Sequence, residues 1–129
     1  MQDLKLDSNE SIYETMGHMC EAWGAEHMGK YGYSAVGAVV GATYPEQLKE
    51  LREKLPHTFF LVPGYGAQGG GADAPGFDPK GLGALINSSR GIMCAWQKNQ
   101  VAETDYAKAA AEEAIRMRDE LIARIGKIG

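Results

Sequence analysis

The sequence predicts an α/β protein in which short parallel strands alternate with helices. Three apolar runs are short and lack polar alternation, which is typical of strands buried on both faces of a parallel sheet. These runs lie at residues 35–42, 58–63 and 84–88. Longer segments with apolar residues at helical spacing lie at 11–27, 44–55 and 104–125. Strands that alternate with helices form right-handed βαβ units, so the three strands are expected to be parallel.

Length and composition limit the possible classes of protein. The chain has 129 residues, 44% of them hydrophobic and 23% charged, which are ordinary values for one globular domain. The net charge of −4 argues against non-specific nucleic-acid binding, which needs clustered Lys and Arg. No apolar run is long enough to span a membrane, and the acidic N-terminus is not a secretory signal. We therefore expect a cytoplasmic protein, with Cys20 and Cys94 reduced and mostly buried.

The three helical segments carry recognisable apolar stripes. We expect the stripe of the first to belong to the core, with Ser8 or Asn9 as its N-cap; the stripe consists of Ile12, Met16, Met19, Cys20 and Trp23. In the second, Thr43 and Glu46 have capping-box spacing. Its buried side is predicted at Leu48, Leu51 and Leu55, and its solvated side at Lys49, Glu50, Arg52 and Glu53. The last helix is predicted to bury Ala110, Ala114, Met117, Leu121 and Ile125, and to pair Glu112 with Arg116.

A glycine-rich loop, VPGYGAQGGGADAPG at residues 62–76, follows the second predicted strand. Its glycines permit close approach of the backbone to a ligand, but a plain surface loop has the same composition. Gly64, Gly66 and Gly69 match the dinucleotide pattern G-x-G-x-x-G only weakly, because no helix opens directly after them. The residues alone leave both interpretations open.

A second candidate, NSSRG, follows the third predicted strand. Arg90 beside exposed backbone N–H groups suits a phosphate, although a lone Arg in a surface turn is the simpler interpretation. In (β/α)₈ barrels the phosphate site is commonly built from the loops after the last two strands. The order of glycine loop, strand, NSSRG and closing helix therefore matches the last strands and last helix of such a barrel. No metal site is expected, because His18 and Cys20 lie on different faces of their helix.

Three segments make the sequence similar to orotidine 5'-phosphate decarboxylase, and in particular to its longer bacterial subfamily. They are GAVVGATYPEQLKELREKLP, FFLVPGYGAQGG and INSSRGI. The resemblance runs from about Tyr33 to the last helix. It implies a (β/α)₈ barrel, usually dimeric, that converts orotidine 5'-phosphate to UMP and CO₂ without a metal or an organic cofactor.

The resemblance also implies which residues bind the substrate. Gln68 and Gly69 correspond to the loop that contacts the substrate phosphate, and Pro63 to the proline that lines the base pocket. Arg90 corresponds to the phosphate-binding arginine, with Ser89 and Gly91 beside it. We expect the loop from Gly66 to Gly76 to be mobile in this chain.

The catalytic signature of the family, Asp-x-Lys-x-x-Asp, is not found in this sequence. DLKLDS has Ser8 at the place of the second Asp, and DPKGLG has Gly83 there. A whole barrel needs about 250 residues. The resemblance therefore implies that residues 1–129 form a single partial domain, the C-terminal half of a (β/α)₈ barrel, with no catalytic residue of its own and inactive alone. Three possibilities stay open: a fragment of the enzyme, a half-barrel completed by a copy of itself or by an N-terminal half-barrel, and a non-catalytic phosphate- or nucleotide-binding module.

Overall fold

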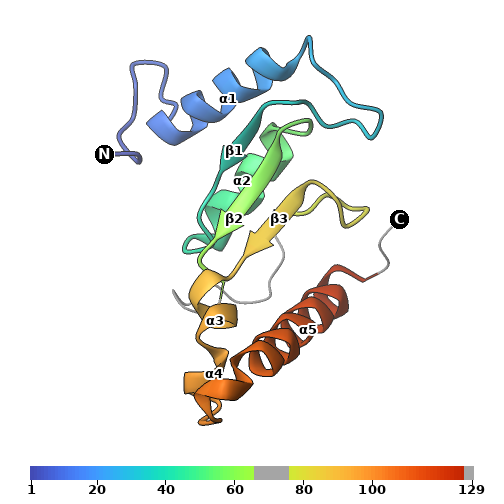
Figure 1. The fold of residues 1–129 in the computed structure, drawn as a ribbon. Helices are drawn as coiled ribbons and strands as arrows, with labels where there is room; N and C mark the ends of the chain where they lie inside the picture. Colours follow the sequence, from blue (N-terminus) through green and yellow to red (C-terminus); the bar gives the residue numbers. More distant parts are fainter. Residues whose placement is uncertain (66–75, 127–129) are drawn as a thin grey trace.

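The computed structural model describes residues 1–65 and 76–126 (Figure 1). Helices and strands alternate in the predicted order, with three short helical segments added before the last helix. In chain order the elements are α1 (Ile12–Gly24), β1 (Gly37–Val39), α2 (Pro45–Lys54), β2 (Phe59–Pro63), β3 (Ala84–Asn87), α3 (Ser89–Met93), α4 (Ala95–Lys98), the 3₁₀ turn η1 (Glu103–Asp105) and α5 (Tyr106–Ile125).

The three strands form one parallel sheet in the order β1-β2-β3, which confirms the predicted fold class. Val39, Leu61 and Leu85 lie opposite one another and make a straight row across the sheet. β1 is shorter than the predicted run at 35–42. Backbone hydrogen bonds to β2 nevertheless continue beyond it, from the N–H of Val40 to Leu61 and from that of Ala42 to Pro63.

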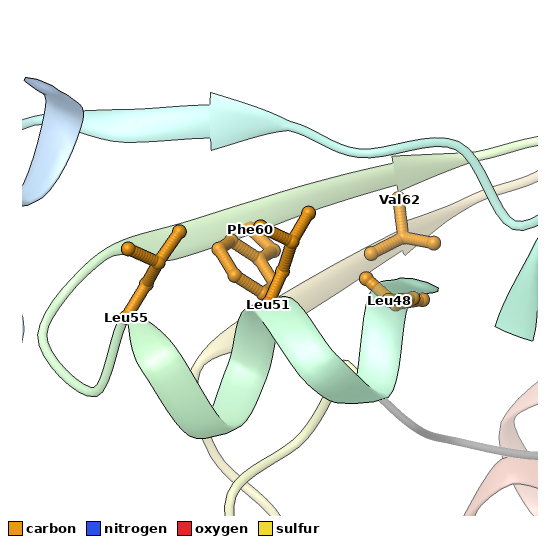
Figure 2. Packing of buried hydrophobic residues seen from close by; sticks show 5 residues of the cluster. All are labelled: Leu48, Leu51, Leu55, Phe60 and Val62. Atoms are coloured by element: carbon orange, nitrogen blue, oxygen red, sulfur yellow. The ribbon is translucent and has the colours of Figure 1, made fainter. Parts of the chain in front are cut away.

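The main core lies between α2 and one face of the sheet (Figure 2). The predicted leucine stripe of α2 is confirmed, and it packs against β2; the buried cluster consists of Leu48, Leu51, Leu55, Phe60 and Val62. Burying a large apolar side chain contributes about 1.5–3 kcal/mol, so this cluster accounts for much of the stability of the chain. α2 ends at Lys54 because Pro56 cannot continue it.

The prediction that the strands are buried on both faces is wrong. The face that carries the row Val39–Leu61–Leu85 is open: Val39 is 70% exposed and Leu85 60% exposed. Side chains alternate between the two faces of a strand, and α2 covers only the face of Phe60 and Val62. Among the described residues, no element covers the other face to the same degree. We call this surface, made of Val39, Phe59, Leu61 and Leu85, the inner face.

The predicted apolar stripe of α1 is also wrong. Met16, Met19 and Trp23 are exposed, and the residues that α1 buries are Glu14, Gly17 and Gly24. Gly17 lets the helix lie directly on the leucines of α2, because a Cβ at this position would overlap Leu55. α1 is therefore rotated so that its polar side faces α2.

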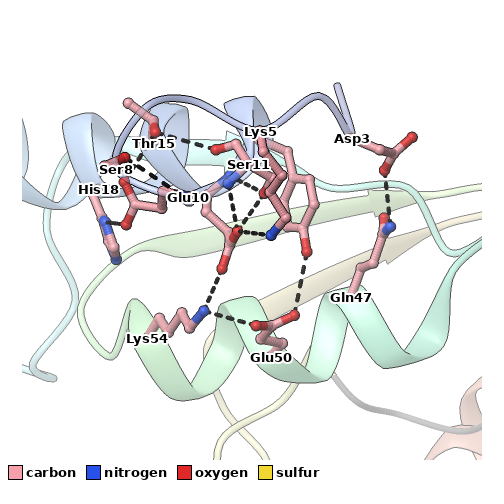
Figure 3. A network of polar contacts seen from close by, with 12 residues as sticks. Asp3, Lys5, Ser8, Glu10, Ser11, Thr15, His18, Gln47, Glu50 and Lys54 are labelled. Carbon is pink, nitrogen blue, oxygen red and sulfur yellow. Dashed lines mark hydrogen bonds and ion pairs between the residues drawn. The ribbon is translucent and has the colours of Figure 1, made fainter. Parts of the chain in front are cut away.

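A polar network joins α1 to α2 where this rotation buries Glu14 (Figure 3). Lys54 of α2 binds the Glu14 carboxylate, and the Ser11 hydroxyl donates to it at 2.5 Å. These contacts lower the pKa of Glu14 to about 2, with the Lys54 ammonium as the largest cause. Ser11 is also the N-cap of α1, in a capping box with Glu14, so the predicted caps at Ser8 and Asn9 are wrong.

Other local predictions need correction as well. The N-cap of α2 is Tyr44, and no side chain caps that helix, so the capping box at Thr43 does not form. Cys20 and Cys94 are unpaired, as expected, but they are half-buried rather than buried. On α5, Met117 is buried as predicted, but the other buried residues are Ala109 and Glu113 rather than Ala110 and Ala114. Arg116 pairs with Glu113 and Glu120, so the predicted pair of Glu112 with Arg116 is wrong.

Arg52 is buried, with 7% of its surface exposed, although we predicted it on the solvated side of α2. Its guanidinium satisfies three backbone carbonyls, those of Leu55, Thr58 and Gly83. The sequence could not place it, because Arg52 follows the buried Leu51 directly and one of its partner carbonyls, that of Gly83, comes from a turn 31 residues away.

Candidate functional site

A pocket of about 180 Å³ opens at the carboxyl ends of β2 and β3. Two segments far apart in the sequence form its walls. One wall consists of Pro63, Gly64 and Tyr65, which end β2, and the other of Asn87, Ser88, Ser89, Arg90 and Gly91, which follow β3. We call this cavity the strand-end pocket.

The wall beyond β3 is the first turn of a helix that the sequence analysis missed. β3 ends at Asn87 and α3 begins at Ser89, so Arg90 and Gly91 lie in helical backbone rather than in a loop. The N–H of Ile92 donates to the carbonyl of Ser88 at 3.1 Å, which closes this turn. The five-residue length of α3 explains the miss, because so short a segment shows no apolar periodicity.

The strand-end pocket is suited to a small anion. Arg90 is exposed and is the one charged residue among the described residues of the lining, which offer hydroxyls, an amide and backbone groups but no carboxylate. A guanidinium with neighbouring hydroxyl and N–H donors matches the acceptor oxygens of a phosphate. The amide nitrogen of Asn87 donates to the Ser89 hydroxyl at 3.2 Å, which links two of the polar groups.

The two walls are tied together by a buried hydrogen bond. The Ser88 hydroxyl donates to the backbone carbonyl of Tyr65 at 3.1 Å, and both residues are buried. The Tyr65 hydroxyl in turn donates to the Glu120 carboxylate of α5 at 2.5 Å. Burial, with the Glu120 carboxylate as a second cause, raises the pKa of Tyr65 to about 12, so its hydroxyl stays a donor at neutral pH.

Of the six predicted site residues, the structure brings four to the same pocket: Pro63, Ser89, Arg90 and Gly91. The other two, Gln68 and Gly69, lie outside the described residues, as does most of the loop predicted to be mobile. Sequence reasoning missed Tyr65 and Ser88. The signal for Ser88 was its place at the end of β3, and Tyr65 stands out as a bulky residue between two glycines of the loop.

Other sites are less suited to a ligand. A larger cavity of about 580 Å³ lies between α1, β1 and α2, with mostly apolar residues around it. Within residues 1–65 and 76–126, no three His, Cys, Asp or Glu side chains are grouped so that they could hold a metal ion. None of the helices in these two ranges has the length and apolar character that crossing a membrane requires.

A three-stranded parallel βα sheet with a pocket at the carboxyl ends of two strands has the arrangement of part of a (β/α)₈ barrel. No protein-family model matches the chain. Curated relatives are orotidine 5'-phosphate decarboxylases: the protein of Clostridium kluyveri is 38% identical over 95% of this chain, and that of Clostridium botulinum strain Loch Maree is 43% identical over 94%. The chain belongs to the orotidine 5'-phosphate decarboxylase family and spans 42% of the length of each of these two relatives.

Solved structures agree with this assignment. The UMP synthase of Leishmania donovani superposes with a TM-score of 0.68 at 32% identity, over 98% of this chain and 25% of that protein. The OMP decarboxylase of the same organism superposes with a TM-score of 0.61 at 30% identity, over 94% of this chain and 42% of that protein. In both comparisons nearly the whole chain matches a minor part of a larger protein, as a half-barrel should.

Proposed function

We propose that this chain carries the phosphate-binding part of an orotidine 5'-phosphate decarboxylase, the enzyme that forms UMP and CO₂. The observation that supports this most directly is the position of Arg90. It lies with Ser89 and Gly91 at the carboxyl end of β3, in a pocket that Pro63 also lines and whose described lining residues include no carboxylate. The family relationship supplies the substrate, and the pocket supplies the donors that its phosphate needs.

The chain contributes to catalysis by binding the substrate phosphate, which lies away from the reacting carbon of the pyrimidine. Arg90 and its neighbours grip the phosphate, and this grip holds the pyrimidine in the orientation that the reaction requires. The charged groups that stabilise the developing carbanion are supplied by residues outside this sequence, because Ser8 and Gly83 break the Asp-x-Lys-x-x-Asp signature. The chain alone therefore binds ligand without turning it over, and needs neither a metal nor an organic cofactor.

The remaining part of the barrel completes the site. The inner face is apolar and open, with Leu85 60% exposed, and an exposed apolar surface of this kind marks an interface. β1 is an edge strand, whose free backbone groups can accept another parallel strand. The relatives are more than twice as long as this chain, so their unmatched part contains enough residues for the missing strands.

Two alternatives differ in what covers the inner face. A second copy of the chain would make a homo-oligomer, whereas a non-catalytic phosphate- or nucleotide-binding module would work uncovered. A sizing column and a UMP titration separate them. A stable pair of two copies favours the first alternative. A chain that stays monomeric, even when it is mixed with the remaining barrel segment of a relative, and that binds UMP tightly favours the second. A single partial domain at residues 1–129 and a cytoplasmic location are further parts of the proposal.

Ligand titration tests the proposed anion site. Inorganic phosphate, UMP and uridine are titrated against the chain and followed by NMR, with Arg90→Gln as the variant. Arg118→Gln, on the exposed side of α5, is the matched control. Phosphate and UMP should bind, and uridine should bind far more weakly. Of the two variants, only Arg90→Gln should lose this difference in affinity between UMP and uridine. Equal binding of UMP and uridine would remove the basis of the proposal.

A further inference from the structure

Tyr65 belongs to both the strand-end pocket and the core. Its ring is buried, with 5% of the residue exposed, beside Met117 of α5. Partly buried apolar residues complete the cluster, namely Ile86, Ile92 and Leu121. Its backbone nevertheless forms part of the pocket wall, next to Pro63 and Gly64. A movement of this side chain relative to α5 would therefore move the wall.

A chain of hydrogen bonds runs through Tyr65 from α5 to the wall that holds Arg90. On α5, Arg116 binds Glu120 at 2.7 Å and is itself held by Glu113 at 2.7 Å. Glu120 accepts the hydrogen bond of the Tyr65 hydroxyl, and the Tyr65 carbonyl accepts that of Ser88. Each of these hydrogen bonds joins buried or charged groups. Ser88 directly precedes Ser89 and Arg90, so the series of hydrogen bonds ends at the proposed anion donors.

Gly91 shows how little freedom this arrangement has. A Cβ on Gly91 would overlap the hydroxyl oxygen of Ser88, the atom that donates to Tyr65. A Cβ at position 91 would displace that hydroxyl and so disturb the link between the two walls. The tie between the walls therefore favours the glycine of NSSRG, in addition to any approach of the ligand to its backbone.

We propose that Tyr65 is a positioning residue for the anion site: its hydroxyl, anchored by Glu120, fixes the separation of the two walls. This inference rests on the proposed phosphate site. The simpler alternative is that Tyr65 only fills the core with its ring. Tyr65→Phe separates the two, because it keeps the ring and removes only the hydroxyl.

The experiment measures two quantities for the wild type and for each variant: the dissociation constant for inorganic phosphate and the free energy of unfolding. A hydrogen bond to a charged group stabilises the position of its donor, and part of that stabilisation passes to ligand affinity. Tyr65→Phe should therefore weaken phosphate binding about fivefold to tenfold. Tyr106→Phe, the same change at an exposed tyrosine of α5, should leave it unchanged. Glu120→Ala, which keeps Tyr65 intact, should reproduce the loss, and serves if Tyr65→Phe does not fold.

Coupling provides a readout that a purely structural role would not change. If Ser88 and Tyr65 act in one chain of contacts, Tyr65→Phe combined with Ser88→Ala should weaken binding less than the product of the single losses. Phosphate affinity that stays at the wild-type value in Tyr65→Phe and Glu120→Ala, with Arg90→Gln impaired, overturns the role of Tyr65 and leaves the anion site standing. Absence of phosphate binding in the wild-type chain overturns the anion site itself, and the role of Tyr65 with it.

Discussion

The guanidinium of Arg52 donates a hydrogen bond to the backbone carbonyl of Gly83 at 3.3 Å, across 31 residues of sequence. The same guanidinium bonds the carbonyl of Thr58 at 2.9 Å and lies 4.2 Å from the centre of the Phe60 ring. These carbonyls belong to the turns that precede β2 and β3. Arg52 therefore holds the amino ends of two strands, at the end of the sheet opposite the strand-end pocket, where barrel residues usually serve stability.

Arg52→Met should destabilise the chain by about 2–4 kcal/mol, because the substitution leaves buried carbonyls without a donor. Chemical denaturation of the purified chain measures the loss. Lys49→Met, one turn earlier on the exposed side of α2, is the control and should change stability by less than about 0.5 kcal/mol. An equal effect of the two variants would contradict the role of Arg52.

A matched pair of glycines separates backbone strain from packing. Gly83 and Gly32 both have positive φ, at 88° and 84°, but a Cβ on Gly83 would overlap the Tyr33 ring, whereas Gly32 faces open space. Gly32→Ala should cost about 1 kcal/mol of strain. Gly83→Ala should cost about 1–3 kcal/mol more, because Tyr33 must move and its 2.7 Å hydrogen bond to Asp78 is disturbed. Equal losses in thermal denaturation would show that Tyr33 moves freely.

Stability should fall in acid because of Glu14. Its pKa is lowered from 4.5 to about 2 in the folded chain, so between these values the unfolded chain binds more protons. The contribution of Glu14 is complete above about pH 4.5 and is lost as the pH falls toward 2. Melting curves from pH 7 to pH 2.5 should therefore show a steeper decline for the wild type than for Glu14→Gln. Parallel declines would mean that the contacts with Lys54 and Ser11 do not stabilise the charged form.

The two faces of β2 and β3 should respond differently to substitution. Phe60→Ala, in the core, should cost about 3–5 kcal/mol. Leu85→Asn, on the open inner face, should change the stability of the chain alone by less than about 0.5 kcal/mol. It should nevertheless weaken association with the remaining barrel segment of a relative, as measured on a sizing column. A loss of stability in the isolated chain comparable to that of Phe60→Ala would show that the inner face is already covered.

Local patterns predicted the elements of the fold, and they failed where burial depends on distant partners. The leucines of α2 and the parallel strands followed from spacing and run length. Arg52 and Trp23 were misplaced because position on one helix does not reveal which neighbour covers it. The inner face was misjudged because its apolar residues are those of a fully buried strand, whereas among the described residues α2 packs only against the opposite face of the sheet.

The candidate site could be located in sequence but not assembled from it. Arg90 and Pro63 were predicted from the segments NSSRG and PGYGAQGG, and both line the strand-end pocket. The contact between Ser88 and Tyr65 was not predictable, because it joins a side chain to a backbone carbonyl 23 residues away.

The most direct test of the account is complementation. The chain is combined with the segment of the Clostridium botulinum relative that it does not match, and CO₂ release from orotidine 5'-phosphate is measured for each part and for the mixture. We predict no turnover by either part, turnover by the mixture, and a loss of that turnover with Arg90→Gln but not with Arg118→Gln. Turnover by the chain alone, or an inert mixture in which the two parts form a stable complex, would contradict the account.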